Sequence, residues 1–188
     1  MRGRDKFERY KGIISFCRGM LCIFPKRMQN SMLVKFRNVT GLKGIVLRYM
    51  LLKNLCQSCG DNVSVHPGVY IFNPQNLKIG DNVSIHPMSY IEAYGGITIG
   101  NDVSIAHNTT IMSVSHNFDN AEIPINSQGI TGMPVEICDN VWIGAKAVIL
   151  GNVKVSRGCV IGASALVNKD TQENAVYAGV PARFIKNR

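Results

Sequence analysis

His116 lies in a polar stretch, Ser115-His116-Asn117, that is followed by the acidic residue Asp119. A free imidazole titrates near pH ~6.5, so it can accept a proton from a hydroxyl group at neutral pH and return it to a leaving group. No Cys or Ser is placed beside it like an activated nucleophile. We therefore expect His116 to act as a general base in a direct transfer between two bound substrates, with Asp119 or a backbone carbonyl orienting its ring.

A six-residue repeat between residues 137 and 168 indicates the elements that must position such a residue. An α-helix repeats near 3.6 residues and a simple strand near 2.0, so a strict period of six fits neither. It fits short strands that are joined by corners and wound into a coil, with one inward aliphatic side chain per strand. Burial of each such side chain contributes roughly 1.5–3 kcal/mol. The repeating aliphatic positions are Ile137, Ile143, Ile149, Val155, Ile161 and Val167.

The same repeat occurs upstream in three copies that start twenty residues apart. Three hexads form one three-sided coil, and two extra residues at a corner explain a spacing of twenty. The repeat predicts an all-β solenoid in which each coil is stabilised mainly by its neighbours. Because the phase is lost after Ile111, we expect an extruded loop over residues 113–134, and long loops of this kind are usually functional. The copies open as Gly60-Asp61-Asn62-Val63-Ser64, Gly80-Asp81-Asn82-Val83-Ser84 and Gly100-Asn101-Asp102-Val103-Ser104.

The first 60 residues are strongly basic. They hold 13 Lys or Arg and 2 acidic residues, whereas the remaining residues hold 8 and 10. A basic segment on a near-neutral domain indicates an anionic partner, such as a membrane surface, a lipid-linked phosphate or nucleic acid. We do not expect nucleic acid, because the segment lacks interleaved aromatic residues and a nucleic-acid motif. A solvated basic face remains an alternative.

Apolar spacing within this segment predicts an amphipathic helix that ends before Pro25 and a second helix over about 42–55. These helices pack against one end of the solenoid or a neighbouring subunit, or they dock at a membrane interface. The chain starts without a signal-peptide pattern, and Ile13 to Phe24 is too short and too charged to span a bilayer. We expect a cytoplasmic protein, with the helices as its means of contact with the inner membrane face. The first helix carries Phe7, Tyr10, Ile14, Cys17, Leu21 and Phe24 at spacings of three and four.

Several motifs resemble the hexapeptide-repeat acyltransferases over roughly residues 56–186: Ser115-His116-Asn117, Pro134-Val135, Asn140-Val141-Trp142-Ile143-Gly144-Ala145, Lys169-Asp170 and Ala178-Gly179-Val180-Pro181-Ala182-Arg183. The chain is similar to galactoside and maltose O-acetyltransferases, and closer in motif to O-acetyltransferases of bacterial surface polysaccharides such as O-antigen and capsule. The resemblance implies a left-handed parallel β-helix, whereas the usual preference would favour a right-handed crossover. It divides the chain into a helical N-terminal segment (1–55), a β-helix of about five coils (56–170) and a C-terminal coenzyme-side cap (171–188).

The resemblance also implies a reaction and its residues. Acetyl-CoA supplies an acetyl group to a sugar hydroxyl, His116 is the catalytic base, and the backbone N–H of Ala145 stabilises the oxyanion. Trp142 forms a wall for pantetheine, and Lys169 and Arg183 lie near the 3′-phosphate of coenzyme A. The expected coenzyme contacts are Trp142, Gly144, Ala145, Ala163, Asn168, Lys169 and Arg183. The expected acceptor contacts are His86, Tyr94, Asn117 and Asp119.

Departures from galactoside acetyltransferase bear on the acceptor. His86 falls where that enzyme has an acceptor-binding asparagine, and Tyr94 lies where it has an acceptor-binding aspartate. A surface polysaccharide or its lipid-linked precursor is therefore favoured over a simple galactoside. Galactoside or maltose, an antibiotic and the amine of a nucleotide sugar remain alternatives. We also expect a homotrimer with active sites between subunits, because His116 lies about one coil from Trp142 on a flat-sided prism.

A metalloenzyme is the alternative from a different class. His66 and His86 are twenty residues apart and share a face on adjacent coils, as zinc-binding histidines do in trimeric γ-class carbonic anhydrases. His107 is one position out of phase and makes an unconvincing third ligand. Cys56 and Cys59 form a lone CxxC pair without a second pair at matching spacing. We therefore expect no metal.

Overall fold

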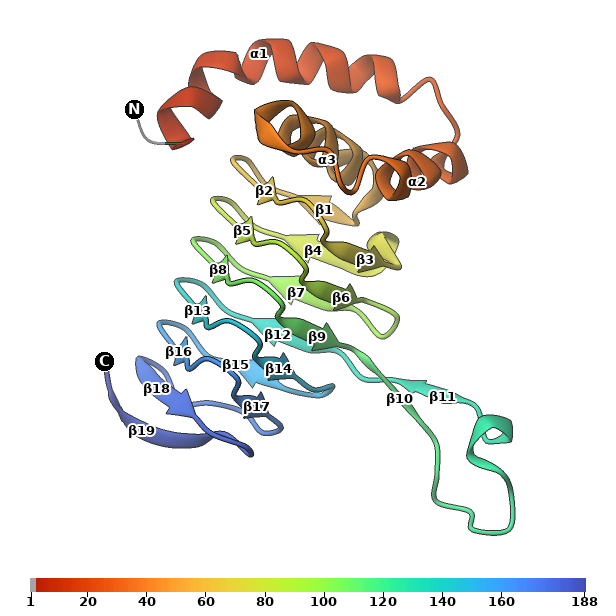
Figure 1. The fold of residues 1–188 in the computed structure, drawn as a ribbon, viewed down its shortest axis with the longest axis vertical. Helices are drawn as coiled ribbons and strands as arrows, with labels where there is room; N and C mark the ends of the chain where they lie inside the picture. Colours follow the sequence, from red (N-terminus) through yellow and green to blue (C-terminus); the bar gives the residue numbers. More distant parts are fainter. Residues whose placement is uncertain (1–2) are drawn as a thin grey trace.

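The computed structural model describes residues 3–188, with side chains from residue 7 onward, and shows a layer of helices over one end of a prism of short strands (Figure 1). The helices are α1 (Gly3–Leu21), α2 (Lys26–Lys35) and α3 (Gly41–Leu55). The prediction of α3 is confirmed. The first helix ends earlier than predicted, at Leu21. α2 was not predicted, because it buries only Gln29 and Leu33 and therefore shows no apolar stripe in the sequence.

The strands form three sheets, here called A, B and C. Sheet A contains the parallel strands β1 (Ser58–Cys59), β4 (Leu77–Ile79), β7 (Ile97–Ile99), β12 (Val135–Ile137) and β15 (Lys154–Val155). Sheet B contains β2 (Ser64–Val65), β5 (Ser84–Ile85), β8 (Ser104–Ile105), β13 (Trp142–Ile143), β16 (Val160–Ile161) and β18 (Ala175–Ala178), with β19 (Arg183–Asn187) antiparallel to β18. Sheet C contains β3 (Tyr70–Phe72), β6 (Tyr90–Glu92), β9 (Thr110–Met112), β14 (Val148–Ile149) and β17 (Leu166–Val167).

The chain visits sheets A, B and C in order and forms a left-handed parallel β-helix of about six turns, where about five were predicted. The predicted inward positions are confirmed, since Ile143, Ile149 and Ile161 are fully buried. In register, Ile143 lies between Ile105 of the preceding coil and Ile161 of the next. Each coil therefore buries its aliphatic residues against its neighbours, as expected for a solenoid.

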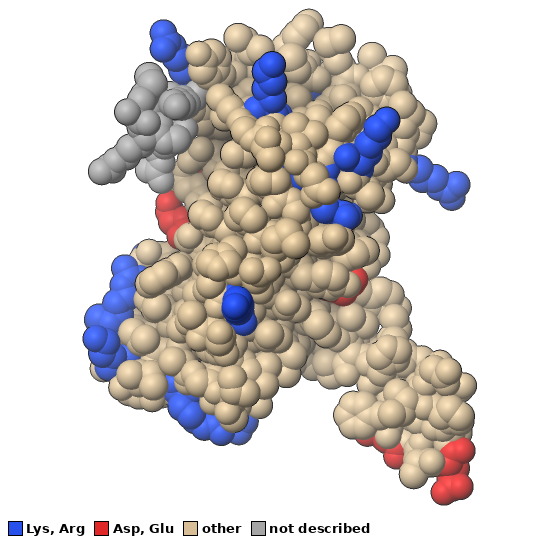
Figure 2. Space-filling model, in the orientation of Figure 1, with Lys and Arg blue, Asp and Glu red and all other residues tan. Residues whose placement is uncertain are grey.

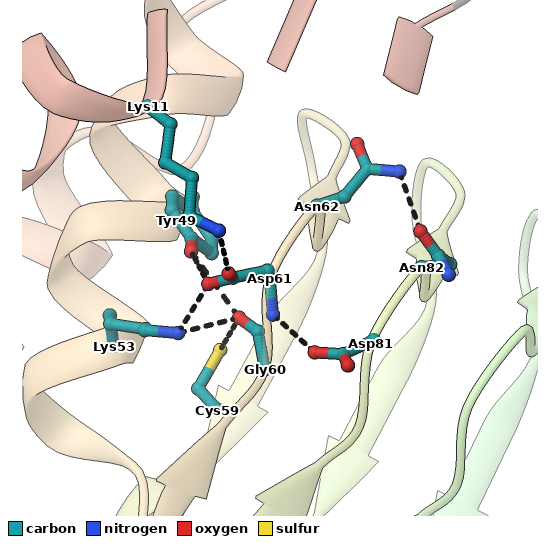
Figure 3. A network of polar contacts seen from close by, with 9 residues as sticks. All are labelled: Lys11, Tyr49, Lys53, Cys59, Gly60, Asp61, Asn62, Asp81 and Asn82. Carbon is teal, nitrogen blue, oxygen red and sulfur yellow. Dashed lines mark hydrogen bonds and ion pairs between the residues drawn. The ribbon is translucent and has the colours of Figure 1, made fainter. Parts of the chain in front are cut away.

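Polar side chains at the corner between sheets A and B explain the repeated Gly-Asp-Asn motif (Figure 3). A carboxylate oxygen of Asp81 accepts a hydrogen bond of 2.6 Å from the backbone N–H of Asp61, one coil earlier. The side-chain amide of Asn62 donates to that of Asn82 at 3.0 Å, and Asn82 has a positive φ of 58°. Asn tolerates this left-handed conformation better than most residues. The motif thus satisfies the polar groups of each corner from the next coil.

The loop between β9 and β12 extends away from the prism, as predicted (Figure 1). Its base is an antiparallel pair, β10 (Val114–His116) with β11 (Ile130–Gly132), and the short 3₁₀ helix η2 (Ile125–Ser127) precedes β11 on the returning arm (Figure 1). The Gln128 side chain donates to the carbonyls of Asn120 at 2.8 Å and Ile123 at 2.7 Å. The loop is therefore held by its own hydrogen bonds. A second 3₁₀ helix, η1 (Pro74–Asn76), precedes β4.

Arg48 of α3 joins the helices to the first coil from a position that is 1% exposed. Its guanidinium donates to backbone carbonyls at the end of α2, in the segment that follows it and in β2. The acceptors are Phe36 (3.0 Å), Arg37 (3.1 Å), Val39 (2.8 Å) and Val65 (2.9 Å). In the described part of the chain, no helix is long and apolar enough to cross a membrane.

We expect Arg48→Met to lower the free energy of unfolding by about 3 kcal/mol, because methionine fills similar space but donates none of the four hydrogen bonds, including the buried one to Val65. Urea unfolding followed by circular dichroism at fixed protein concentration measures the change. Lys43→Met is the matched control, because Lys43 is an exposed cation on the same helix. Equal stability of the two variants would contradict the structural role of Arg48.

Candidate active site

His116 lines a cleft of about 860 Å³ at the corner between sheets C and A, where the extruded loop leaves the prism. The cleft brings together three of the predicted site residues, His116, Tyr94 and Asn168. Tyr94 is 46% exposed, so its ring is available to a ligand. The remaining lining includes Asn73, Glu92, Phe118 and Met133.

The backbone of His116 is fixed by the hairpin at the base of the loop. In the β10–β11 pair, Ser115 lies opposite Thr131 and His116 lies opposite Ile130. The His116 side chain itself is exposed. Among the described residues, the structure records no hydrogen bond between its imidazole and Asp119, so the orienting group stays unassigned.

Asn117 has a structural role in the loop. Its amide nitrogen donates to the Gln128 carbonyl at 3.1 Å, and its amide oxygen accepts a hydrogen bond of 2.7 Å from the Thr131 hydroxyl. Neither Asn117 nor Asp119 lines the cleft. The structure therefore does not bring these two residues into the His116 cleft, and Asn117 instead supports the hairpin that carries His116.

Trp142 lies on the outside of sheet B and is 56% exposed. The chain then enters the corner between sheets B and C, where Gly144 is buried against the next coil. A side chain on Gly144 would place its Cβ 2.6 Å from the backbone nitrogen of Ala163, so glycine is required there. Gly144, Ala145 and Ala163 thus form one continuous backbone surface that starts beside Trp142.

The backbone N–H groups of Ala145 and Ala163 donate no hydrogen bond to any residue in the described part of the chain. The residues next to them do form such hydrogen bonds. The backbone N–H of Gly144 donates to the Ile161 carbonyl, and that of Ser164 donates to the Ala145 carbonyl, both at 2.8 Å. The same corner position is proline in the first two coils, at Pro67 and Pro87. Proline has no N–H, so only later coils present a donor here. Sequence reasoning missed this signal, in which proline at the corner of the first two coils is replaced by alanine at Ala145 and Ala163.

His86 lies at the same corner, nearer the helices. Its ring stacks on that of His66, with centroids 4.7 Å apart and planes 10° apart, as their shared phase predicted. Burial lowers the pKa of His66, and the neighbouring His86 and Arg48 lower it further. A neutral imidazole is therefore favoured at this position. Within residues 3–188, no group of three or more His, Cys, Asp or Glu side chains is placed to hold a metal ion.

The candidate residues thus occupy two different corners of one subunit. His116, Tyr94 and Asn168 lie at the C–A corner, whereas Ala145, Ala163 and His86 lie at the B–C corner. Sheet C separates these corners. Lys169 follows Asn168, and Arg183 begins β19, and both side chains are exposed. A single subunit therefore does not place His116 against the Ala145 donor.

Glu92 is a cleft residue that sequence reasoning missed. It accepts a hydrogen bond of 2.7 Å from the Asn73 side chain, which links two coils along one wall of the cleft. In register, Glu92 lies between Phe72 and Met112 on sheet C. An acidic residue at an outward strand position between apolar ones was the available signal.

Comparison with known proteins places this geometry in a family. The family model "Bacterial transferase hexapeptide (six repeats)" matches residues 134–169. Galactoside O-acetyltransferase of Escherichia coli K12 is 33% identical over 161 residues, which are 86% of this chain and 78% of that protein. A probable acetyltransferase of Mycobacterium tuberculosis is 37% identical over 78 residues, which are 42% of this chain but 26% of that protein.

Two solved structures share the fold. The maltose O-acetyltransferase of Clostridium difficile 630 is 29% identical with a TM-score of 0.76, and the match covers 86% of this chain and 85% of that one. A hexapeptide-repeat-containing acetyltransferase of Vibrio cholerae in complex with acetyl-CoA is 26% identical with a TM-score of 0.76, and the match covers 86% of each chain. The chain therefore belongs to the hexapeptide-repeat acetyltransferases.

Proposed function

We propose that this acetyltransferase moves the acetyl group of acetyl-CoA to a sugar hydroxyl of a bacterial surface polysaccharide or of its lipid-linked precursor. The observation that carries the proposal is the open cleft of about 860 Å³, which His116 lines together with the exposed rings of Tyr94 and Phe118. Aromatic side chains with exposed faces suit a sugar ring, which has an apolar face and polar edges. The Escherichia coli relative is named as a galactoside O-acetyltransferase, and the Vibrio cholerae neighbour is complexed with acetyl-CoA.

His116 starts the chemistry in this proposal. Its imidazole accepts the proton of the acceptor hydroxyl while the hydroxyl oxygen attacks the thioester carbonyl. The backbone N–H of Ala145 donates a hydrogen bond to the oxyanion of the tetrahedral intermediate. When this intermediate collapses, the carbon–sulfur bond breaks and the imidazolium returns the proton to the thiolate of coenzyme A. The products are the acetyl ester and the free thiol.

The structure offers suitable groups for the coenzyme. The exposed Trp142 ring provides an apolar wall for pantetheine, and the unpaired N–H of Ala163 lies at the same corner, one coil beyond Ala145. An amide donor of this kind matches an amide carbonyl of pantetheine. Asn168, Lys169 and Arg183 lie on the last coil and the C-terminal hairpin, where we place the 3′-phosphate. Gly144 has a structural role in this site, because its lack of a side chain allows the backbones of adjacent coils to lie close together.

The two-corner arrangement supports a homotrimer with each active site between subunits. His116 of one subunit would meet Ala145 and His86 of its neighbour, and cyclic symmetry would repeat that contact three times. Sheet C, which separates the two corners, carries an exposed aromatic cluster suited to such an interface. Its members are Tyr70, Phe72 and Tyr90, and the Arg37 guanidinium lies 3.9 Å from the centroid of the Tyr70 ring. We place the enzyme in the cytoplasm, with contact at the inner membrane face.

The acceptor class is tested by incubating the enzyme with acetyl-CoA and a panel of acceptors while a thiol reagent measures released coenzyme A. We expect faster release with repeat-unit oligosaccharides of capsule or O-antigen than with galactosides or maltose, since an open cleft of about 860 Å³ has room for more than one sugar ring. An O-acetyl ester in the product, identified by its loss in mild base, distinguishes the reaction from N-acetylation. Preference for a simple galactoside, or an amide product, would overturn the proposed acceptor.

A further inference from the structure

We propose that the groove between α1 and α3 binds a hydrocarbon chain of an anionic bilayer phospholipid, whose phosphate lies against Lys11, Arg18 and Lys53. The groove has a volume of about 500 Å³ and lies beside the A–B corner of the first two coils. It is separate from the cleft of His116, at the C–A corner, and none of its lining residues has a role in the proposed reaction. The proposal therefore stands independently of the acceptor.

The helices line this groove with apolar and aromatic side chains only. They include Tyr10 and Ile13 from α1 and Leu42, Ile45 and Val46 from α3. Ile13 and Leu42 are 63% and 56% exposed, so the rim of the groove is apolar as well. Exposing such a surface to water is unfavourable. The prism side of the groove is more polar, with Asn62, Ser64, Asn82 and Ser84. Asn62 donates to Asn82 at 3.0 Å and Ser84 to Ser104 at 3.2 Å, so a hydrocarbon chain can cover the helix side while these groups keep their own partners.

A cationic depression of about 100 Å³ adjoins the groove and shares Phe7, Ile14 and Tyr49 with it. Lys11 and Lys53 approach the carboxylate of Asp61 at 2.6 and 2.9 Å (Figure 3). The third cation, Arg18, makes no hydrogen bond or ion pair with a side chain described in the structure. Three cations around one carboxylate leave an excess of positive charge, and a guanidinium suits a phosphate. An apolar groove that ends at such a site fits an amphiphile with an anionic headgroup.

The outer face of α1 explains how a bilayer lipid reaches this site. Its side chains Phe16 and Met20 are 73% and 56% exposed, and Ile23, in the turn that follows α1, is 80% exposed. On its other face, α1 buries Ile14 against the layer below. The helix lies across the end of the prism (Figure 1), and basic side chains project from the same end (Figure 2). An apolar helix face flanked by basic residues is typical of interfacial membrane binding.

Charge favours a bilayer over a second copy of this chain as the occupant. Residues 9–60 contain ten Lys or Arg and no acidic residue. Two such layers would repel each other, whereas the headgroups of anionic lipids attract each basic residue near the surface. The exposed aromatic cluster of sheet C, which we assign to the subunit interface, belongs to a different face of the prism.

Vesicle sedimentation at low salt tests the surface with the full chain. We expect binding to phosphatidylcholine vesicles that contain phosphatidylglycerol, and weak binding to phosphatidylcholine alone. Arg18→Gln should weaken binding roughly fivefold and Ile13→Asn roughly tenfold. The matched controls are Arg157→Gln and Ile185→Asn, which alter an exposed arginine and a 56% exposed isoleucine at the other end of the molecule. Equal binding to both vesicle types, or equal effects of test and control variants, would overturn the proposal.

Calorimetry with monomeric short-chain lipids tests the groove itself. We expect dihexanoyl-phosphatidylglycerol to bind, and both dihexanoyl-phosphatidylcholine and glycerol phosphate to bind at least roughly fivefold more weakly, since each lacks one half of the recognised chemistry. Equally strong binding of glycerol phosphate would show that a free phosphate site is present instead. Light scattering completes the test: a change of oligomeric mass in Ile13→Asn would assign this face to a subunit contact and overturn the proposal.

Discussion

Replacing His116 by alanine is expected to lower kcat by roughly 10²–10⁴-fold and to leave the affinity for acetyl-CoA almost unchanged. A sugar hydroxyl is a weak nucleophile near neutral pH, and the cleft holds no Cys or Ser that would form a covalent intermediate in place of a general base. Ser115 lines the cleft, but its hydroxyl donates to the His116 backbone carbonyl at 3.1 Å and does not contact the imidazole. Loss of the base therefore affects the chemical step and not the binding of coenzyme.

Steady-state kinetics with varied acetyl-CoA and acceptor measure this effect. Trp142→Ala is the contrasting variant, because it should chiefly raise the KM for acetyl-CoA through loss of the exposed apolar wall. Asp119→Asn tests the orienting role, and we expect little change because the structure records no contact of Asp119 with the imidazole among the described residues. Near-normal turnover in folded His116→Ala protein would show that the histidine only packs in the loop.

The coil was predictable because its signal is repeated many times. Residues one coil apart lie in register, so Ile143 and Ile161 occupy the same inward position and each provides separate evidence for the repeat. The extruded loop was predictable for the converse reason, since 113–134 breaks a period that is otherwise regular. Within the site, Tyr94 and Asn168 lie in the His116 cleft, and their predicted contacts with acceptor and coenzyme stay predictions.

The helical layer shows where the sequence lacks such redundancy. Arg48 resembles one more solvated cation in the sequence, yet it is buried because four backbone carbonyls from two separate segments, residues 36–39 and Val65, converge on it. α1 has a second, exposed apolar face that a search for one buried stripe does not reveal. Whether such a side chain is buried depends on which segments of the chain meet in the folded protein. The spacing of apolar residues along a helix does not contain that information.

Replacing Ala145 by proline is expected to lower kcat by about 10²–10³-fold, because it removes the proposed oxyanion donor. The fold should tolerate the change, since Pro67 and Pro87 occupy the same corner position in the first two coils. No hydrogen bond within the described chain is lost, because the Ala145 N–H has no partner there. Ala163→Pro is the matched control: it removes an equivalent N–H one coil away and should weaken coenzyme binding without a comparable loss of kcat.

The same variant tests whether each active site lies between subunits. His116→Ala and Ala145→Pro subunits are each expected to be nearly inactive alone, and light scattering should give a trimer for both. After the two are unfolded together and refolded in equal amounts, random trimers contain intact sites wherever His116 of one subunit meets Ala145 of its neighbour. That combination occurs at about one quarter of the interfaces in a cyclic trimer, so about one quarter of wild-type activity should return. If both residues acted within one subunit, each subunit would still carry one defect, and mixing would restore no activity.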